Sequence, residues 1–377
     1  MNLDFFDPIS EAISLDQHQY DQLGLALTQQ ADEHFEDATV CLIGVEDKRY
    51  GRSCSSIRRS LYSYFLPSHF PAIYDLGNIR IENDFFDTAD DFYKVIAECL
   101  ERNITLCFFG GGRQFLYELQ QAYAFAKRYT NIGLITSSFV VQDDEDEETN
   151  IDNFLYRICA SRPSYLFQIS QLAHQRYLVD RSSLALFKEM NFEAMRLGKV
   201  RDDIQETEPI LRDVDILNIS TQAIKQAETG GQPRCSPNGL YSEEVAQLCK
   251  YAGVSDNLSS VLFNDYDSLY DTNGACAQLI AQSIWCFMEG VAARKAEFPH
   301  KPNNGFTKYT VHNAEMNVEL LFVKSEKTGR WWIEMPKDKA LLREEFFLPC
   351  TFEDYQTALD GDIPERWLRG FNKLNEK

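Results

Sequence analysis

The chain has 377 residues, 44% hydrophobic and 13% aromatic, which is enough to build a large globular core. Asp and Glu outnumber Lys and Arg by 58 to 37, and the net charge of −21 repels phosphate backbones and anionic lipid. The N-terminus lacks the basic and apolar regions of a secretion signal, and no later run has the length of an apolar membrane span. We therefore expect a cytoplasmic protein that binds neither nucleic acid nor a membrane.

The ten cysteines are spread through apolar segments, and none has the CxxC spacing of zinc sites and redox motifs. Scattered cysteines in apolar surroundings are typical of reduced, buried thiols. We expect neither a disulfide framework nor a cysteine metal site.

Short apolar runs rich in β-branched and aromatic residues alternate with longer helical stretches along the chain. This alternation is typical of βα units and of a mainly parallel sheet covered by helices on both faces, a three-layer α/β/α fold. The predicted strands are 38–46, 104–112, 132–141, 163–170 and 214–220. The predicted helices are 86–102, 242–253 and 268–298.

The sequence changes character after the last of these helices. Residues 318–336 form two alternating, aromatic-rich runs around a Glu-Lys-Thr-Gly turn, which predicts a β-hairpin. Residues 351–375 predict two short helices. We therefore divide the chain into an α/β domain over 1–299 and a small α+β C-terminal extension over 300–377.

A glycine-rich turn, Gly110, Gly111 and Gly112, follows the strand 104–112 and leads into Arg113. Free backbone N–H groups beside a guanidinium suit a carboxylate or a phosphate, so these four residues are candidates for an anion pocket. The alternative is that the glycines serve a tight turn and that Arg113 pairs with a nearby acid of the chain.

An acidic run, DDEDEE at 143–148, follows the strand 132–141. The carboxyl edge of a parallel sheet normally carries its ligand sites, so this run could attract a cation. Like-charge runs are more often solvated loops, which is the alternative interpretation.

Five segments carry local signatures at strand ends and helix starts. They are IGVEDKRYGRSCSSIRRSLYSYF (43–65), AIYDLGNI (72–79), FGGGRQF (109–115), TGGQPRCSPNGLYSEEV (229–245) and NDYDSLYDTNGACAQLIAQ (264–282). In this order they resemble the arginases, agmatinases and formimidoylglutamases, the ureohydrolase family, from near the N-terminus to about residue 298. The resemblance implies an arginase-like fold and makes self-association, as trimers or hexamers, a reasonable expectation.

The resemblance also implies a site in which six His and Asp side chains hold two manganese ions. In this sequence the His of the family's Gly-Gly-Asp-His motif falls on Arg113, and the preceding Asp falls on Gly112. The other ligand positions fall on Ser138, Val140, Gln142, Ser220 and Gln222. Mn²⁺ needs several converging carboxylate or imidazole donors, and Arg113 adds a fixed positive charge where a dication would lie. We therefore predict no metal cofactor.

We expect a non-catalytic ureohydrolase homologue, a pseudoenzyme with a binding, regulatory or scaffolding role. Its partner would be another protein or a second copy of the chain, and a small anionic ligand is a further candidate. The alternative is an active hydrolase of C–N bonds in linear amidines, with a relocated site built from Asp143, Asp144, Asp265 and Asp267. Asp265 is also the counterpart of a substrate-contacting Glu in the family. Fold similarity alone cannot decide between these functions.

Overall fold

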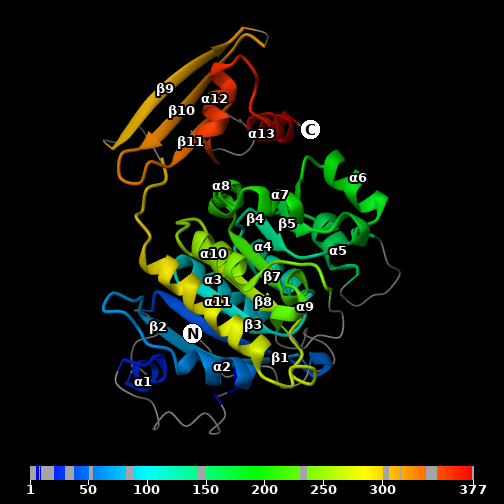
Figure 1. The fold of residues 1–377 in the computed structure, drawn as a ribbon, viewed down its shortest axis with the longest axis vertical. Helices are drawn as coiled ribbons and strands as arrows, with labels where there is room; N and C mark the ends of the chain where they lie inside the picture. Colours follow the sequence, from blue (N-terminus) through cyan, green and yellow to red (C-terminus); the bar gives the residue numbers. More distant parts are fainter. Residues whose placement is uncertain are drawn as a thin grey trace.

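The structure, a computed structural model, describes most of the chain. Figure 1 shows a large sheet layered between helices and a smaller sheet at one end of the molecule. The residues described are 6–7, 9, 21–29, 38–50, 54–81, 89–142, 150, 152–229, 236–299, 305–314, 316–336 and 346–375.

The larger sheet has eight strands in the order β2-β1-β3-β8-β7-β4-β5-β6, and all neighbouring pairs are parallel. The central strands are apolar and buried, as parallel strands with helices on both faces must be. The strands are β1 (Val40–Asp47), β2 (Ile73–Ile81), β3 (Thr105–Gly110), β4 (Thr130–Ile135), β5 (Leu166–His174), β6 (Glu193–Arg196), β7 (Ile216–Ser220) and β8 (Ser260–Asn264).

Helices cover both faces of this sheet and enclose a separate hydrophobic core on each face. One core is packed by α1 (Leu23–Gln29), α2 (Cys54–Tyr62), α7 (Leu197–Asp202), α8 (Thr207–Asp213), α10 (Ser242–Gly253) and α11 (Ala275–Ala292). The other is packed by α3 (Ala89–Glu101), α4 (Phe115–Phe125), α5 (Phe154–Ala160) and α6 (Arg181–Glu189). The short α9 (Gln226–Thr229) follows β7. These layers confirm the predicted α/β/α fold class. None of the helices described is both long and apolar enough to cross a membrane.

Three predicted elements were wrong in extent. The strand predicted over 163–170 covers Leu166–His174. The strand predicted over 132–141 ends at Ile135, because Phe139 and Val141 reach the core from a loop rather than from a strand. The helix predicted over 268–298 covers only Ala275–Ala292. Its start is fixed by Asn273, which accepts from the backbone N–H of Ala275, and by Asp271, whose carboxylate accepts from the backbone N–H groups of Cys276 and Ala277.

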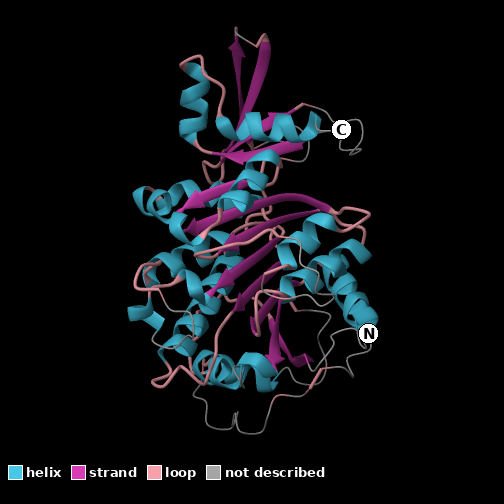
Figure 2. Cartoon of the chain, turned by 90° about the vertical axis from the view of Figure 1, so that its right-hand side faces the viewer, coloured by secondary structure: helices cyan, strands magenta, loops and turns pink. Residues whose placement is uncertain are grey.

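The C-terminal extension is a four-stranded antiparallel sheet of order β12-β11-β10-β9, with two helices on one face (Figure 2). Its core includes Trp331, which stacks on Tyr355 with ring centroids 5.0 Å apart. The elements are β9 (Phe306–Asn313), β10 (Val318–Ser325), β11 (Trp331–Met335), β12 (Phe346–Cys350), α12 (Phe352–Leu359) and α13 (Glu365–Asn375). The small α+β extension is confirmed, with two more strands than the predicted hairpin.

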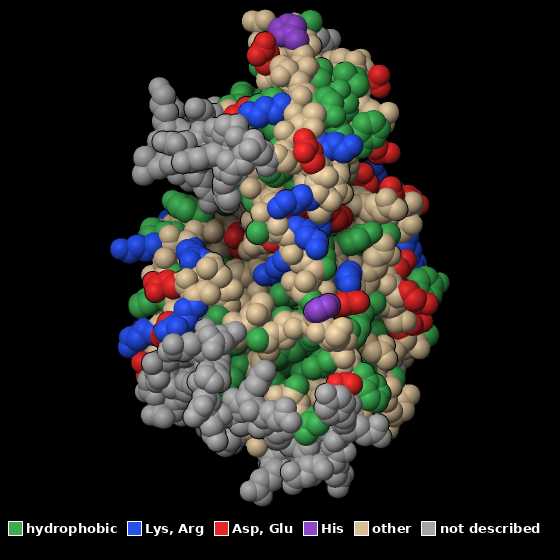
Figure 3. All heavy atoms as spheres, turned by 90° about the vertical axis from the view of Figure 1, so that its left-hand side faces the viewer, with side chains coloured by type: hydrophobic (Ala, Val, Ile, Leu, Met, Phe, Trp, Pro, Cys, Tyr) green, Lys and Arg blue, Asp and Glu red, His purple; other side chains and the backbone are tan. Residues whose placement is uncertain are grey.

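Arg212, on α8, binds the extension to the larger unit through hydrogen bonds and a cation–π contact. Its Nη2 donates to the backbone oxygens of Trp331 at 3.2 Å and Cys350 at 3.3 Å, and its guanidinium lies 4.3 Å from the ring centroid of Trp332. Figure 3 shows basic side chains gathered where the extension meets the larger unit. The extension is therefore packed on the core through polar and cation–π contacts rather than carried on a free linker.

A buried ion pair ties α2 to β2. Arg58 Nε lies 2.8 Å from Asp75 Oδ2, its Nη2 lies 2.9 Å from Oδ1, and the two side chains are 1% and 2% exposed. Tyr62 also donates to the Asp75 carboxylate at 2.6 Å. Charges taken out of water need such bidentate pairing and further hydrogen bonds to be tolerated.

We predict that Asp75→Asn lowers the free energy of unfolding by about 3–5 kcal/mol, because it leaves the Arg58 charge buried without a counter-charge. The matched control is Asp91→Asn, which breaks a 3.0 Å pair with Lys94 that is exposed to solvent and contributes about 1 kcal/mol or less. Urea denaturation followed by circular dichroism measures both changes. Equal losses in the two variants would contradict the prediction.

Candidate functional site

Most of the candidate residues follow four strands that are neighbours in the sheet, in the order β3-β8-β7-β4. Because these strands are parallel, the loops that follow them meet at one carboxyl edge. Arg113 follows β3, Ser138 follows β4, and Asp265 follows β8. Ser220 ends β7, and Gln222 lies in the one-turn helix η7 (Thr221–Ala223) behind it.

The guanidinium of Arg113 lies at the centre of this edge, with its side chain 7% exposed. Its Nη1 donates to Thr136 Oγ1 at 3.2 Å and to the backbone oxygen of Ser138 at 3.3 Å. Its Nη2 donates to Gln222 Oε1 at 3.1 Å, and its Nε lies 3.5 Å from Asp265 Oδ2. One side chain thus joins the ends of four strands.

Asp265 supplies the negative charge that pairs with Arg113, and its carboxylate also accepts hydrogen bonds from other groups. Its Oδ2 accepts from Ser220 Oγ at 2.6 Å, and its Oδ1 accepts from the backbone N–H of Arg113 at 3.2 Å. Its own N–H donates to Gly111 O at 2.9 Å, and its φ of 62° places it in the left-handed region that Asp tolerates better than most residues. The loops after β3 and β8 are therefore joined by charge and by hydrogen bonds.

The turn formed by Gly110, Gly111 and Gly112 brings the backbone close to neighbouring side chains. Gly110 and Gly111 have φ angles of 96° and 61°, which glycine adopts without steric cost. A side chain on Gly111 would come within 2.8 Å of Val45, and one on Gly112 would collide with the Tyr50 hydroxyl. In this structure the anion beside the turn and Arg113 is the chain's own Asp265. Binding of an external anion stays a prediction.

Two neighbouring residues, Asp47 and Tyr50, extend the polar cluster and were missed in the sequence. Asp47 ends β1 and accepts from Arg49 Nη2 at 2.7 Å and from Gln114 Nε2 at 3.3 Å. Burial raises the pKa of Tyr50, and the Asp265 and Asp47 carboxylates raise it further, so its hydroxyl stays protonated. Asp47 could have been found by the strand-end argument, because it directly follows a buried apolar run.

None of the contacts described above joins the remaining candidate residues to the Arg113 guanidinium. Asp267 is buried in the loop after β8, where its Oδ1 accepts from the backbone N–H of Leu269 at 2.9 Å. Val140 is half-buried and Gln142 is exposed. Asp143 and Asp144, with the rest of the acidic run 143–148, lie outside the described residues.

No protein-family model matches the chain, and no curated protein matches it. Solved structures do. Formimidoylglutamase from Bacillus subtilis superposes with a TM-score of 0.60 at 19% identity, over 68% of this chain and 88% of that chain. This chain has the ureohydrolase fold.

Other structures with this fold agree. A manganese-bound formiminoglutamase from Trypanosoma cruzi gives a TM-score of 0.62 at 13% identity, over 72% of this chain and 99% of that chain. Agmatine ureohydrolase of Thermoplasma volcanium gives 0.56 at 14%, over 73% and 95%. At these identities the likeness establishes the fold and leaves the activity of this chain open.

The described residues at the carboxyl edge do not fit a manganese pair. Among the residues that the structure describes, no group of three or more His, Cys, Asp or Glu side chains could hold a metal ion. Asp265 is the carboxylate at the centre of the edge, and the fixed charge of Arg113 lies 3.5 Å from it. A dication at this place would have to displace that guanidinium against Coulomb repulsion.

We predict strong coupling between Arg113 and Asp265. Asp265→Asn should lower the free energy of unfolding by about 3–5 kcal/mol, since Asn keeps the shape and tolerates the left-handed backbone but leaves Arg113 without its counter-charge. Arg113→Met should destabilise for the reciprocal reason. The double variant should lose clearly less than the sum of the single losses, as measured by chemical denaturation of all four proteins. Additive losses would contradict the pairing.

His174, at the end of β5, serves as a neutral packing residue in the structure. Its ring is buried, and its Nδ1 lies 2.7 Å from Gln171 Oε1. Gln171 Nε2 donates to the backbone oxygens of Thr136 and Leu172, so Oε1 is the acceptor and Nδ1 carries the proton. Burial lowers the pKa of His174 below 6.5.

The unfolded chain therefore binds a proton at His174 more readily than the folded chain does. We predict that this residue's contribution to stability is lost as pH falls below 6.5. The variant His174→Asn, whose amide can still donate to Gln171, should show a shallower loss of stability between about pH 7 and 5. Denaturation midpoints across that range measure the slope, and equal slopes in both proteins would contradict the prediction.

Proposed function

We propose that this protein is a non-catalytic member of the ureohydrolase fold group, with a binding, regulatory or scaffolding role. The observation that carries the proposal is the Arg113 guanidinium, held by Asp265, Thr136, Ser138 and Gln222 at the edge where parallel sheets bind ligands. On this proposal, Arg113, Ser138, Val140, Gln142, Ser220 and Gln222 stand where related enzymes have metal ligands.

The chemistry of the edge supports this proposal. Hydrolysis of a guanidino or formimino carbon needs an activated water, which a metal or a general base must supply. Asp265 could act as a base only if its carboxylate were free to take a proton. It instead accepts hydrogen bonds from Ser220 and the Arg113 backbone and pairs with the Arg113 side chain. Both carboxylate oxygens are therefore already engaged by groups of the chain itself.

The alternative function, hydrolysis at a relocated site with Asp143, Asp144, Asp265 and Asp267, has one observation in its favour. Asp265 and Asp267 are both buried in the loop after β8, at the same edge of the sheet. Both are engaged, Asp265 by Arg113 and Asp267 by the Leu269 backbone. We therefore rank this function second.

The decisive experiment is metal analysis and activity assay on one preparation. The full chain would be purified with Mn²⁺ in the medium and buffers, and bound metal would be measured by elemental analysis. Release of urea from arginine and agmatine, and of formamide from formimidoylglutamate, would be assayed beside an active ureohydrolase prepared in the same way. We expect a folded protein with neither stoichiometric manganese nor turnover.

Turnover above the protein-free rate, with or without manganese, would overturn the non-catalytic proposal and favour the relocated site. A binding role requires a partner, and we propose that it is a protein or a second copy of this chain. Sedimentation velocity over a range of concentrations tests self-association. A protein that stays monomeric throughout would direct the search to other proteins.

A further inference from the structure

The four-stranded sheet of the extension ends in an open edge strand, β9. It is the last strand in the order β12-β11-β10-β9, and its eight residues pair with β10 without a bulge. Figure 1 shows β9 on the outer side of the extension, away from the helices of the larger unit. An edge strand of this kind presents a row of backbone N–H and C=O groups that can pair with another chain.

The backbone pattern identifies the groups of β9 that point outward. Glu326 N donates to Gly305 O at 2.9 Å, and the same register continues along β9 and β10. Opposed residues of an antiparallel pair alternate between bonded and unbonded positions. The residues of β9 whose backbone groups point away from β10 are therefore Phe306, Lys308, Thr310 and His312. In the described part of the chain, none of these backbone groups bonds to a segment outside the sheet.

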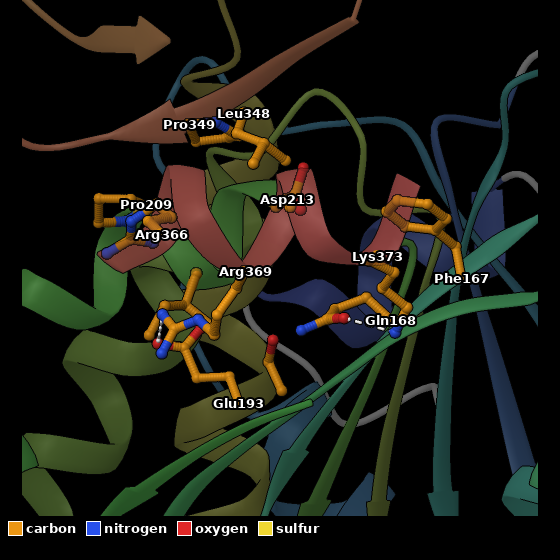
Figure 4. A pocket seen from close by; sticks show the side chains of 13 residues that line it. Phe167, Gln168, Glu193, Pro209, Asp213, Leu348, Pro349, Arg366, Arg369 and Lys373 are labelled. Carbon is orange, nitrogen blue, oxygen red and sulfur yellow. Dashed lines mark hydrogen bonds and ion pairs between the residues drawn. The ribbon is translucent and has the colours of Figure 1, made fainter. Parts of the chain in front are cut away.

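The other three sheet edges of the molecule are closed. On β2, Asn78 exchanges two backbone hydrogen bonds with Asp7, at 2.8 and 2.9 Å. On β6, which has four residues, Glu193 is paired with Arg369 of α13 at 2.7 Å (Figure 4). On β12, Pro349 occupies an outward position and has no N–H to offer. Proteins close sheet edges in these ways to prevent pairing with other chains, and β9 has none of these three features.

A second copy of the chain is the partner that this edge favours. Two identical edges in antiparallel orientation place donors opposite acceptors about a two-fold axis. The registers that align the outward groups set Lys308 of one copy opposite Thr310 or His312 of the other, so the lysines do not oppose each other. β9 contains no Asp or Glu, and two strongly acidic chains can therefore meet here without opposed carboxylates.

We propose that β9 pairs with β9 of a second copy as antiparallel strands, which joins the two extensions into one continuous sheet. The inference rests on the part of the proposed function that names a second copy as the partner. It does not depend on whether the carboxyl edge of the large sheet is catalytic.

The test is sedimentation velocity of the full chain over a range of concentrations, with two variants of one residue. Thr310→Pro removes an outward N–H and leaves the bonds to β10 in place, because those bonds belong to the neighbouring residues. Thr310→Val keeps the N–H and the β-branched shape, so it is the matched control. We expect reversible dimers of the native chain and of Thr310→Val, and a dissociation constant about tenfold or more higher for Thr310→Pro. Circular dichroism would establish that both variants are folded.

Hydrogen exchange of the native chain gives a second readout that does not need a variant. Backbone exchange in β9 should slow as the concentration rises, while exchange in β12 stays unchanged. A monomer at every concentration would overturn the inference and leave the non-catalytic proposal to its own metal and activity assays. Dimers of equal strength in Thr310→Pro and Thr310→Val, or protection confined to segments away from β9, would also overturn it, because the copies would then meet at another surface.

Discussion

A buried guanidinium paired with a buried carboxylate fixes the carboxyl edge of the large sheet. Arg113 and Asp265 each lose several kcal/mol of hydration when they are removed from water. That cost is offset only because Asp265 is also bound by Ser220, and the guanidinium by the side chains of Thr136 and Gln222. Thr136 follows β4, and Ser220 and Gln222 lie at the end of β7 and just behind it, so the pair constrains the ends of β3, β4, β7 and β8 together.

On the proposal made above, this ion pair is what distinguishes the chain from the enzymes whose fold it shares. A metal centre at the same edge would need converging donors, and it would force the Arg113 charge to leave its partners. On the proposal that the chain is non-catalytic, the fold persists while this ion pair occupies the edge of the sheet. The glycine turn can be kept without a metal because its left-handed backbone is needed for the close approach of Gly111 to Val45.

Arginine side chains also stabilise the contact between the C-terminal extension and the core. In a strongly acidic chain, Arg212 lies over Trp332, and Arg330 lies 3.2 Å from Glu208 and 3.1 Å from Glu297. These ion pairs and the cation–π contact hold the extension against the core. They also explain why the extension is integral to the structure although its sequence changes character abruptly after the last core helix.

Much of the fold could be predicted from the sequence, because buried parallel strands leave local apolar runs. Strands with a short apolar run, or with none, were missed. β6 alternates half-buried and exposed residues, and the apolar run of β8 is only Val261, Leu262 and Phe263, between Ser260 and Asn264. The loop carrying Phe139 was mistaken for a strand because its side chains reach the core from irregular backbone.

The location of the candidate site was predictable, since the ends of parallel strands meet at one edge. The pairing of Arg113 with Asp265 within the site was not predictable. Whether Arg113 binds an external anion or a carboxylate of the chain depends on the backbone of the loop after β8, where Asp265 takes a left-handed conformation. Thr136 was missed because a lone hydroxyl after a strand carries no motif.

The most direct test of this account is a crystal structure of the chain grown with Mn²⁺, with anomalous diffraction recorded to locate manganese. The account predicts no anomalous peak at the carboxyl edge and a guanidinium of Arg113 in contact with Asp265. A manganese peak between the ends of β3, β4, β7 and β8, with Arg113 turned away, would contradict it.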